Sequence, residues 1–527
     1  MGRMFRSEKL LDSPRSARKL ERVFGQKIFA KLAGKLGNMA EGEMSLNQSH
    51  FGTFEQVLDP RNVEVPPSPR ASERPDGFGF SQSEIVCDES ELASIVFDPT
   101  VGTSNRPTQP AEDASGENGY LAVEVSRENL KAEAEELDKR FGVFGRTVKK
   151  GLGPGVPSRR GVRLGSNVRF PASPAGFPLR GAGGIEWDCL NIPCIFDRNR
   201  TGFEESKEFP IVIGAEVAGR FEIIEFLGAA GFSKAVHAKE MSSGKSVCLK
   251  IVENNKDFLD QALDEIRILR LLAANGSLSA NRVVSLIEFF YHREHLFIVT
   301  ELLKDNLYEY SRFNREQESE LFFTVPRVQK VAKEILKALE FAHSLSIIHC
   351  DLKPDNILVR SYSKEQYVLI DFGSASFSHD HQSFYIQSRF YRAPEVLLGC
   401  PYDAKIDIWS LGCVLYELAV GEALFETESP AALLAKIAGV FGPFPDHMLK
   451  HKQASKLLFE GKLFVEPQRE SEQSAVAYVP LSFKIESKIR PFDGGFVEFL
   501  KTILSVDPAK RPTATEALKH PWLFCDY

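Results

Sequence analysis

The chain has 527 residues, of which 43% are hydrophobic and 26% are charged, and its net charge is -7 at pH 7. This composition is typical of a soluble chain that can bury a core, and it excludes collagen-like, coiled-coil and wholly disordered proteins. No uncharged apolar run approaches the ~20 residues of a membrane helix, so we expect no transmembrane span. The negative balance gives no electrostatic case for binding nucleic acid or an anionic membrane.

The eight cysteines are spread along the chain without a C-x-x-C pair, and only Cys189 and Cys194 lie close together. This spacing argues against a disulfide scaffold or a zinc site and favours reduced thiols. The first residues contain no secretory apolar core, and Arg6 stands where the myristoylation pattern needs Ser or Thr. We therefore expect a protein of the cytoplasm, the nucleus or both.

Residues 1–184 are rich in Ser, Pro and Gly, and we expect them to be largely disordered, with short amphipathic helices. One predicted helix spans 17–36, with apolar residues four apart and basic residues on its other faces. It is either a nascent or docked helix of the tail, or a membrane-surface, targeting or partner-binding helix. A second predicted helix, at 127–140, carries no chemistry.

From about Gly219 onward the pattern changes. Short β-type runs come first, such as 221–224 and 247–250, and long helical patterns follow, such as 328–345. Strands followed by helices indicate the α+β class. We expect residues 221–524 to form one two-lobed domain.

The residues that carry chemistry stand in five motifs. The run I-H-C-D-L-K-P-D-N covers 348–356, D-F-G covers 371–373 and A-P-E covers 393–395. Upstream, Lys250 ends a β-type run and Glu265 lies in a helical run. In this order the set resembles the protein kinases across the whole predicted domain, and it implies the two-lobed eukaryotic protein kinase fold.

The resemblance implies that the domain moves the γ-phosphoryl group of ATP. Asp351 is expected to orient the acceptor hydroxyl and take its proton, and Lys353 to neutralise charge on the moving group. Lys250 is expected to hold the α- and β-phosphates, fixed by an ion pair with Glu265. Oxygen donors suited to Mg²⁺ are Asn356 and Asp371.

Two further contacts are expected to be architectural: Glu395 with Arg511, and Asp407 with the catalytic loop. Glu395 should meet Arg511 and tie the activation segment to the large lobe. Asp407 lies in the run D-I-W-S-L-G, which matches the kinase helix that anchors the catalytic loop. Both pairs serve order and stability.

The phosphate loop departs from the kinase pattern G-x-G-x-x-G-x-V. Gly228 is in place, but Ala230 and Ser233 replace the second and third glycines and Ala235 replaces Val. Alanine loses access to positive φ and keeps the backbone slightly farther from phosphate. This departure motivates the rival hypothesis of a pseudokinase scaffold. The residues expected to surround ATP in this loop are Leu227, Gly228, Ala229, Ala230, Gly231, Phe232, Ser233, Lys234 and Ala235.

The expected adenine site lies between the lobes. Backbone groups of Glu301 and Leu303 should bind the adenine edge, and Thr300 would be a small gatekeeper. Cys248 takes the position that usually carries Ala against the ring. Its thiol is either an apolar filler or, if its pKa is lowered, an addressable nucleophile.

Two segments indicate which family of protein kinases the chain resembles. Cys350 replaces the Arg of H-R-D, and the activation segment reads S-F-Y-I-Q-S-R-F-Y-R over 383–392. Both resemble the DYRK family, the dual-specificity tyrosine-regulated kinases of the CMGC group, including Yak-type members. In that family a tyrosine here, matched by Tyr385, is autophosphorylated, and the mature enzyme modifies Ser and Thr of proteins, often with Pro after the acceptor. Arg389 and Arg392 are close enough in sequence to pair with a phosphate on this tyrosine.

Other features concern the branch. Ser383 replaces the first tyrosine of the family's Y-x-Y, and Thr300 replaces its common aromatic gatekeeper. The run at 199–205 and the unusual phosphate loop resemble a plant or algal-type branch, which implies that residues 185–220 pack on the small lobe. The D-F-G-S-A-S run also resembles the HIPK type, a related alternative, and residues 450–490 fit the CMGC insert.

Overall fold

The computed structural model describes residues 120–126, 169, 179–180, 186–187, 189–201, 206–317, 322–380, 383, 385–427, 429–459, 463–467, 474–489, 491 and 493–527. The helices expected at 17–36 and 127–140, and most of the tail expected to be disordered, lie outside these ranges. In the described part of the chain, no helix combines the length and apolar character needed to cross a membrane.

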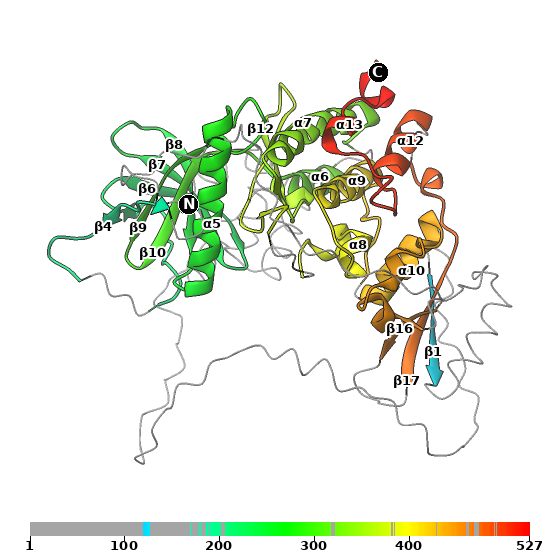
Figure 1. Cartoon of the computed structure of the whole chain (residues 1–527). Coiled ribbons are helices and arrows are strands. Elements are labelled where there is room, and N and C mark those ends of the chain that lie inside the picture. The colour runs from blue at the N-terminus through cyan, green and yellow to red at the C-terminus, as the bar shows by residue number, and fades with distance from the viewer. Residues whose placement is uncertain are drawn as a thin grey trace, which may run out of the picture. The chain divides into compact units, whose positions relative to one another are not determined.

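The small lobe is built on a seven-stranded sheet with the order β4-β9-β10-β8-β7-β6-β5 (Figure 1). All neighbours are antiparallel except β4 and β9, which run parallel. The strands are β4 (Cys194–Ile195), β5 (Glu216–Val217), β6 (Phe221–Ala230), β7 (Ser233–Glu240), β8 (Ser246–Val252), β9 (Leu286–His292) and β10 (His295–Glu301).

Strand β10 is buried on both faces, and its side chains alternate between two cores. Phe297 and Val299 pack into a cluster with residues of β6 to β9. Leu296 and Ile298 pack into a second cluster with helix α5 (Lys256–Asn275). The helix therefore covers one face of the sheet.

Helix α5 starts where the side chain of Asn255 accepts a hydrogen bond from the Asp257 N–H. Ala262, Ile266 and Leu269 are buried at helical spacing. Glu265 belongs to the same buried face, so the fold carries its carboxylate toward the sheet.

Residues that precede the kinase-like domain also belong to the small-lobe core. Phe209 is 5% exposed, and its ring meets that of Phe297 edge-on at 5.2 Å. The backbone oxygen of Lys207 lies 3.1 Å from Nε2 of His295. Together with β4, these contacts fix the incoming chain on the small lobe.

The large lobe is mainly helical and surrounds one continuous core. Its α-helices are α6 (Leu307–Gln317), α7 (Val325–Ser344), α8 (Pro394–Leu397), α9 (Lys405–Val420), α10 (Pro430–Phe441), α11 (Ala454–Leu457), α12 (Gly494–Ile503) and α13 (Ala514–Ala517). Its 3-10 helices are η5 (Pro354–Asn356), η6 (Arg389–Tyr391), η7 (Met448–Lys450), η8 (Ile485–Ser487) and η9 (Pro521–Phe524).

Helix α9 is buried almost all round and forms the centre of this lobe. A Cβ added at Gly412 would lie 2.6 Å from the side chain of Leu504, so only glycine permits this close approach. The helix ends at Val420 and is capped by Gly421, whose φ of 91° is left-handed and favours glycine.

Short antiparallel pairs shape the loops. They are β11 (Ile347–Ile348) with β14 (Ser376–Phe377), β12 (Ile357–Ser361) with β13 (Gln366–Leu369), and β2 (Leu179–Arg180) with β3 (Glu186–Trp187). The first two pairs position the catalytic loop and the D-F-G run. The strands-then-helices order expected for the α+β class is confirmed.

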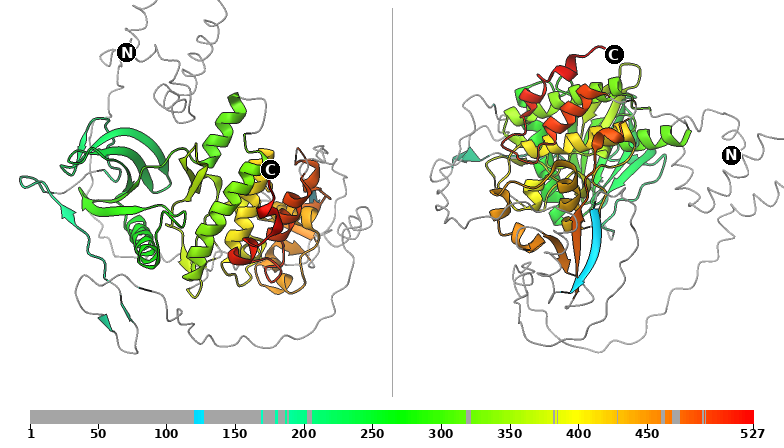
Figure 2. Two further views of the ribbon diagram at one scale, coloured as in Figure 1. Left: turned by 90° about the horizontal axis from the view of Figure 1, so that it is seen from above. Right: turned by 90° about the vertical axis from the view of Figure 1, so that its right-hand side faces the viewer.

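The segment expected to be the CMGC insert contains β15 (Leu458–Phe459), β16 (Leu463–Pro467) and β17 (Ser474–Pro480). A strand from the N-terminal region, β1 (Tyr120–Ser126), joins them in a sheet of order β1-β17-β16-β15. Figure 1 and the right-hand view of Figure 2 both show β1 beside β17. This strand was not predicted from the sequence.

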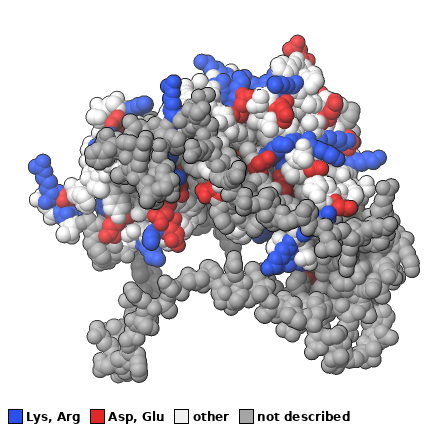
Figure 3. Space-filling model, in the orientation of Figure 1, with Lys and Arg blue, Asp and Glu red and all other residues white. Residues whose placement is uncertain are grey.

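Charged side chains of both signs are mixed over the face in Figure 3, where Lys and Arg lie among Asp and Glu. On the described residues of this face, no continuous block of one sign is visible. This mixture is typical of an ordinary solvated surface.

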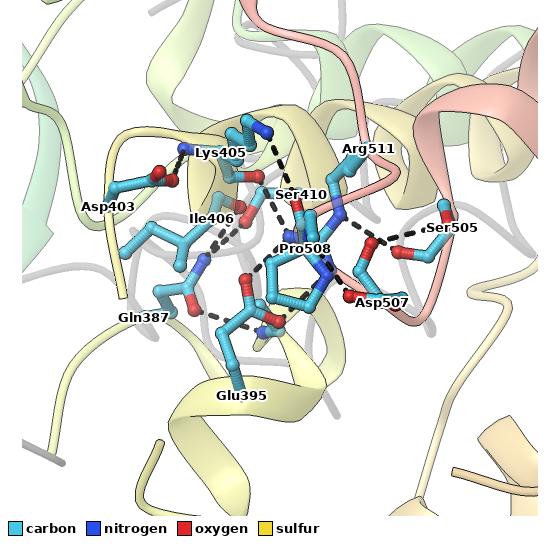
Figure 4. A network of polar contacts seen from close by, with 12 residues as sticks. Gln387, Glu395, Asp403, Lys405, Ile406, Ser410, Ser505, Asp507, Pro508 and Arg511 are labelled. Atoms are coloured by element: carbon cyan, nitrogen blue, oxygen red, sulfur yellow. Dashed lines mark hydrogen bonds and ion pairs between the residues drawn. The ribbon is translucent and has the colours of Figure 1, made fainter. Parts of the chain in front are cut away.

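A buried ion pair ties the activation segment to the large lobe (Figure 4). Arg511 donates to both carboxylate oxygens of Glu395, at 2.6 and 3.0 Å, and both side chains are at most 1% exposed. The same guanidinium donates to the carbonyl oxygens of Ser505 and Lys405, at 3.0 and 2.9 Å. The expected pairing of Glu395 with Arg511 is therefore present.

Breaking this pair should destabilise the domain strongly. Arg511→Met leaves a buried carboxylate without its cation, which costs about 3–5 kcal/mol. Arg267→Met is the matched control, because Arg267 pairs with Asp264 at the surface, where both side chains are at least half exposed, and its loss should cost less than about 0.5 kcal/mol. Urea unfolding followed by tryptophan fluorescence measures both. Equal midpoints for the two variants would contradict the assigned role.

Candidate active site

Lys250, at the centre of the site, bridges two carboxylates from different parts of the chain. Its Nζ lies 2.7 Å from Oε2 of Glu265 on α5 and 2.9 Å from Oδ1 of Asp371. Burial by itself would lower the pKa of Lys250, but the two carboxylates outweigh it and raise this pKa above its ordinary value. The ammonium therefore stays charged and joins β8, α5 and the D-F-G run.

The two carboxylates respond differently to this cation. Burial raises the pKa of Glu265, and Lys250 opposes that rise. Burial acts the same way on Asp371, but there Lys250 prevails and holds the pKa below its ordinary value. Asp371 is thus the firmly ionised member of the pair at neutral pH.

A second cluster surrounds Asp351, just after β11. Its Oδ2 accepts from Nζ of Lys353 at 2.7 Å and from the amide nitrogen of Asn356 at 3.2 Å. Its Oδ1 accepts from the hydroxyl of Ser388 at 2.7 Å and from the Ser388 N–H at 3.1 Å. Ser388 was not predicted as a site residue, although it lies in the Q-S-R run on which the resemblance to the DYRK family rests.

Asp407 holds the catalytic loop in shape from the first turn of α9. It is fully buried and accepts from the N–H of His349 at 2.8 Å and of Cys350 at 3.0 Å. Cys350 has φ of 63° and Asp371 has φ of 62°, the left-handed region that non-glycine residues rarely adopt. Such backbone persists only where surrounding contacts enforce it, and Asp407 provides them at Cys350.

The phosphate loop is a continuous hairpin. Its pairing runs from Gly228↔Ala235 to Ala230↔Ser233, with Gly231 and Phe232 at the turn. Neither Gly228 nor Gly231 has a positive φ, and a Cβ added at either residue would meet nothing within 4 Å. The concern that alanine lacks access to positive φ therefore does not apply to this loop, because the ladder needs only extended backbone.

Two side chains of the loop contact residues outside it. The ring of Phe232 lies 5.3 Å from Nζ of Lys250, so the tip folds over the lysine. Lys234 forms an ion pair with Glu208 of the segment that precedes the domain. Lys234 is therefore engaged at the surface of the small lobe.

The hinge is tied to both lobes by one carboxylate. Glu301, at the end of β10, accepts from Arg360 on β12, at 2.9 Å from Nε and 2.5 Å from Nη2. It also accepts from the Ser285 N–H at 2.9 Å. Cys248 lies opposite Thr300 in the adjoining ladder. Arg360 was not predicted, because its spacing from the hinge gives no signal in the sequence.

The activation segment exposes one aromatic ring beside a cation. Tyr385 is 89% exposed, and the guanidinium carbon of Arg392 lies 5.6 Å from its ring centroid. Arg392 also donates to the backbone oxygens of Ile386 and Gln387, both at 2.8 Å. Arg389 is exposed nearby in sequence. The ring is thus accessible and next to fixed positive charge.

Gln387 was also missed by the sequence analysis. Its side chain is buried and donates to the oxygens of Ile406 and Ser410, at 3.1 and 2.8 Å, and accepts from the Ala393 N–H at 3.0 Å. Its φ of 64° is left-handed. These bonds fix the backbone beside Ser388.

Cysteine reactivity should follow burial. Burial raises the pKa of Cys350 and of Cys400 to about 12, so these thiols stay protonated and unreactive at pH 8. Among the cysteines of the described residues, iodoacetamide should label the exposed Cys194 and Cys525 first. Mass spectrometry of the native protein over time measures this order. Labelling of Cys350 as fast as Cys194 would contradict the packed catalytic loop.

Comparison with known proteins agrees with this geometry. The protein kinase domain family matches residues 221–523. A probable serine/threonine-protein kinase dyrk2 of Dictyostelium discoideum is 38% identical over 60% of this chain and 34% of its own length. The DYRK-family kinase pom1 of Schizosaccharomyces pombe is 37% identical over 61% of this chain and 29% of its own.

A human relative, dual specificity tyrosine-phosphorylation-regulated kinase 4, is 36% identical over 62% of each chain. The chain thus spans about a third of the length of the first two relatives and about three fifths of the human protein. The residues matched by the family include strands β6 to β17, the catalytic loop and the activation segment. The chain belongs to the protein kinases, and its kinase domain is of the DYRK family.

Proposed function

We propose that the protein is an active kinase that transfers the γ-phosphoryl group of ATP to Ser or Thr of other proteins and phosphorylates its own Tyr385. The observation that carries the proposal is the bridge from Lys250 to both Glu265 and Asp371. Phosphoryl transfer depends on positioning and on charge neutralisation, and this bridge assembles the groups that do both.

Each cluster has a task in the proposed reaction. Backbone groups of Glu301 and Leu303 bind the adenine edge, between walls that include Leu227 and Cys248. Lys250 neutralises the α- and β-phosphates. Nucleotide enzymes commonly hold Mg²⁺ with one or two protein oxygens and the phosphates, and the donor set of Asp371 and Asn356 fits this. The ion would neutralise charge on the phosphate oxygens.

Asp351 acts on the acceptor. Ser388 already places a hydroxyl 2.7 Å from Oδ1 of Asp351, which shows the reach of that carboxylate toward an alcohol. An acceptor hydroxyl held there gives its proton to Asp351 as its oxygen bonds to phosphorus and the bond to ADP breaks. Lys353, 2.7 Å from the same carboxylate, offsets the negative charge.

A preference for Pro after the acceptor has support in the activation segment. The carbonyl oxygen of Gln387 accepts from Nη2 of Arg392, so it has a partner beside the acceptor site. An ordinary residue after the acceptor would bring an N–H, for which the Gln387 carbonyl, already bonded to Arg392, is a poorer acceptor. Proline brings none, and therefore loses nothing.

The pseudokinase alternative rests on Ala230 and Ser233. The hairpin keeps its pairing at both positions, and the loop backbone needs no glycine there. Active transfer is therefore the hypothesis that the geometry favours. The finer placement in a plant or algal-type branch rests on the sequence resemblance.

Autophosphorylation tests the proposal directly. Full-length protein expressed in bacteria should carry phosphate on Tyr385, because bacteria rarely modify such a tyrosine. Asp371→Asn should carry none, because it removes a proposed ligand for Mg²⁺. Intact mass and phosphopeptide analysis measure both. Phosphate on both proteins, or on neither, would count against catalysis by this chain under these conditions.

The hinge clamp should act on nucleotide affinity. Arg360→Met removes the cation from Glu301 and loosens the backbone proposed to bind adenine. We expect KM for ATP to rise by about three- to tenfold with kcat within about twofold of the parent. Arg267→Met, at the surface of the small lobe, should change neither constant. An unchanged KM in Arg360→Met would remove the assigned role.

A further inference from the structure

The insert sheet has an edge that a distant part of the chain covers. Strand β1 pairs with β17 over seven residues, from Tyr120↔Pro480 to Ser126↔Ser474. The rings of Tyr120 and Tyr478 meet edge-on at 5.6 Å. The other side of β17 is taken by β16. The sheet therefore offers one long edge, and residues 120–126 occupy it.

Two prolines determine which backbone groups of β17 form that edge. In an antiparallel pair, opposite residues alternate between exchanging two hydrogen bonds and exchanging none. Pro467 of β16 faces Ala475 and has no N–H, so this pair belongs to the set without bonds. Ala475 and, two residues on, Ala477 and Val479 therefore direct their N–H and C=O groups away from β16.

These groups point to β1. The register places Val125 opposite Ala475 and Val123 opposite Ala477. The position of Pro480 is consistent with this register. Pro480 faces Tyr120 in a pair that exchanges no hydrogen bonds, so the N–H that proline lacks is not needed there. Consequently Leu121, Val123 and Val125 exchange hydrogen bonds with β17, whereas the N–H groups of Ala122 and Glu124 point outward.

The receiving edge is supported by elements other than β1. Strand β16 pairs with the other side of β17, from Phe464↔Tyr478 to Pro467↔Ala475. Helix α10 starts with a cap in which Ser429 accepts from two N–H groups, and it packs against both β16 and β17. A sheet edge supported in this way can accept any extended segment of suitable pattern.

We propose that the β17 edge is a strand-docking site on the large lobe and that residues 120–126 of the same chain are its occupant. This contact anchors the N-terminal region to the insert, while β4 fixes the chain to the small lobe. Release of β1 would open the edge to a competing strand.

A matched pair of proline variants in the full-length protein tests the proposal. Val123→Pro removes an N–H that bonds to β17, and Glu124→Pro removes one that points outward, where an edge strand tolerates proline. Hydrogen–deuterium exchange resolved to single residues measures the amides of β17. Val123→Pro should speed exchange at Ala475, Ala477 and Val479 by about tenfold or more, and Glu124→Pro by less than about twofold.

The amides of Val476 and Tyr478 are internal controls, because they bond to β16. They should keep their protection in Val123→Pro, and faster exchange there would show that the edge does not exist without β1. A peptide of residues 118–128 added to Val123→Pro should restore protection at Ala477, and the same peptide with Val123→Pro should not. Unchanged exchange in the variant, or protection that depends on protein concentration, would overturn docking within one chain.

Discussion

The arrangement of the active site depends on one buried cation. Lys250 holds Glu265 of α5 and Asp371 of the D-F-G run at hydrogen-bonding distance at the same time. Three elements that are far apart in sequence therefore meet at a single ammonium. Removing it would leave two carboxylates close together in a poorly solvated site, where like charges repel and α5 would lose its link to the large lobe.

The second constraint is the backbone of the catalytic loop. Cys350 and Asp371 adopt left-handed conformations, and Asp407 is placed by α9 to bond the N–H groups of His349 and Cys350. The close approach of α9 to Leu504 at Gly412, and the buried pair of Arg511 with Glu395, keep that helix and the activation segment in place. The energy stored at the site is thus offset by packing elsewhere in the large lobe.

The sequence was sufficient wherever a residue's task leaves a fixed spacing. The motifs around Lys250, Asp351 and Asp371 predicted the fold class and the groups that meet, because the protein kinase fold carries those side chains in that order along the chain. Glu395 and Asp407 were predicted for the same reason. Their partners lie tens of residues away, but they occupy defined places in the motifs.

Other features depend on register and tertiary distance, which spacing does not reveal. Arg360 reaches Glu301 only because β12 passes beside the hinge, and Gln387 matters only because Ile406 and Ser410 lie next to it. Strand β1 is a short alternating run within a polar region, and it becomes a strand because β17 presents an edge. The phosphate loop was judged from its missing glycines, whereas its ladder needs none with positive φ.

The central claim is that this site transfers phosphate, and single-turnover transfer from radiolabelled ATP tests it most directly. The acceptor is a peptide with a Ser-Pro pair, and the comparison is between the parent protein and Lys250→Met. The account predicts rapid labelling of the serine by the parent and a loss of about a hundredfold or more in the variant. Equal, background-level labelling by both proteins in the presence of Mg²⁺ would contradict it.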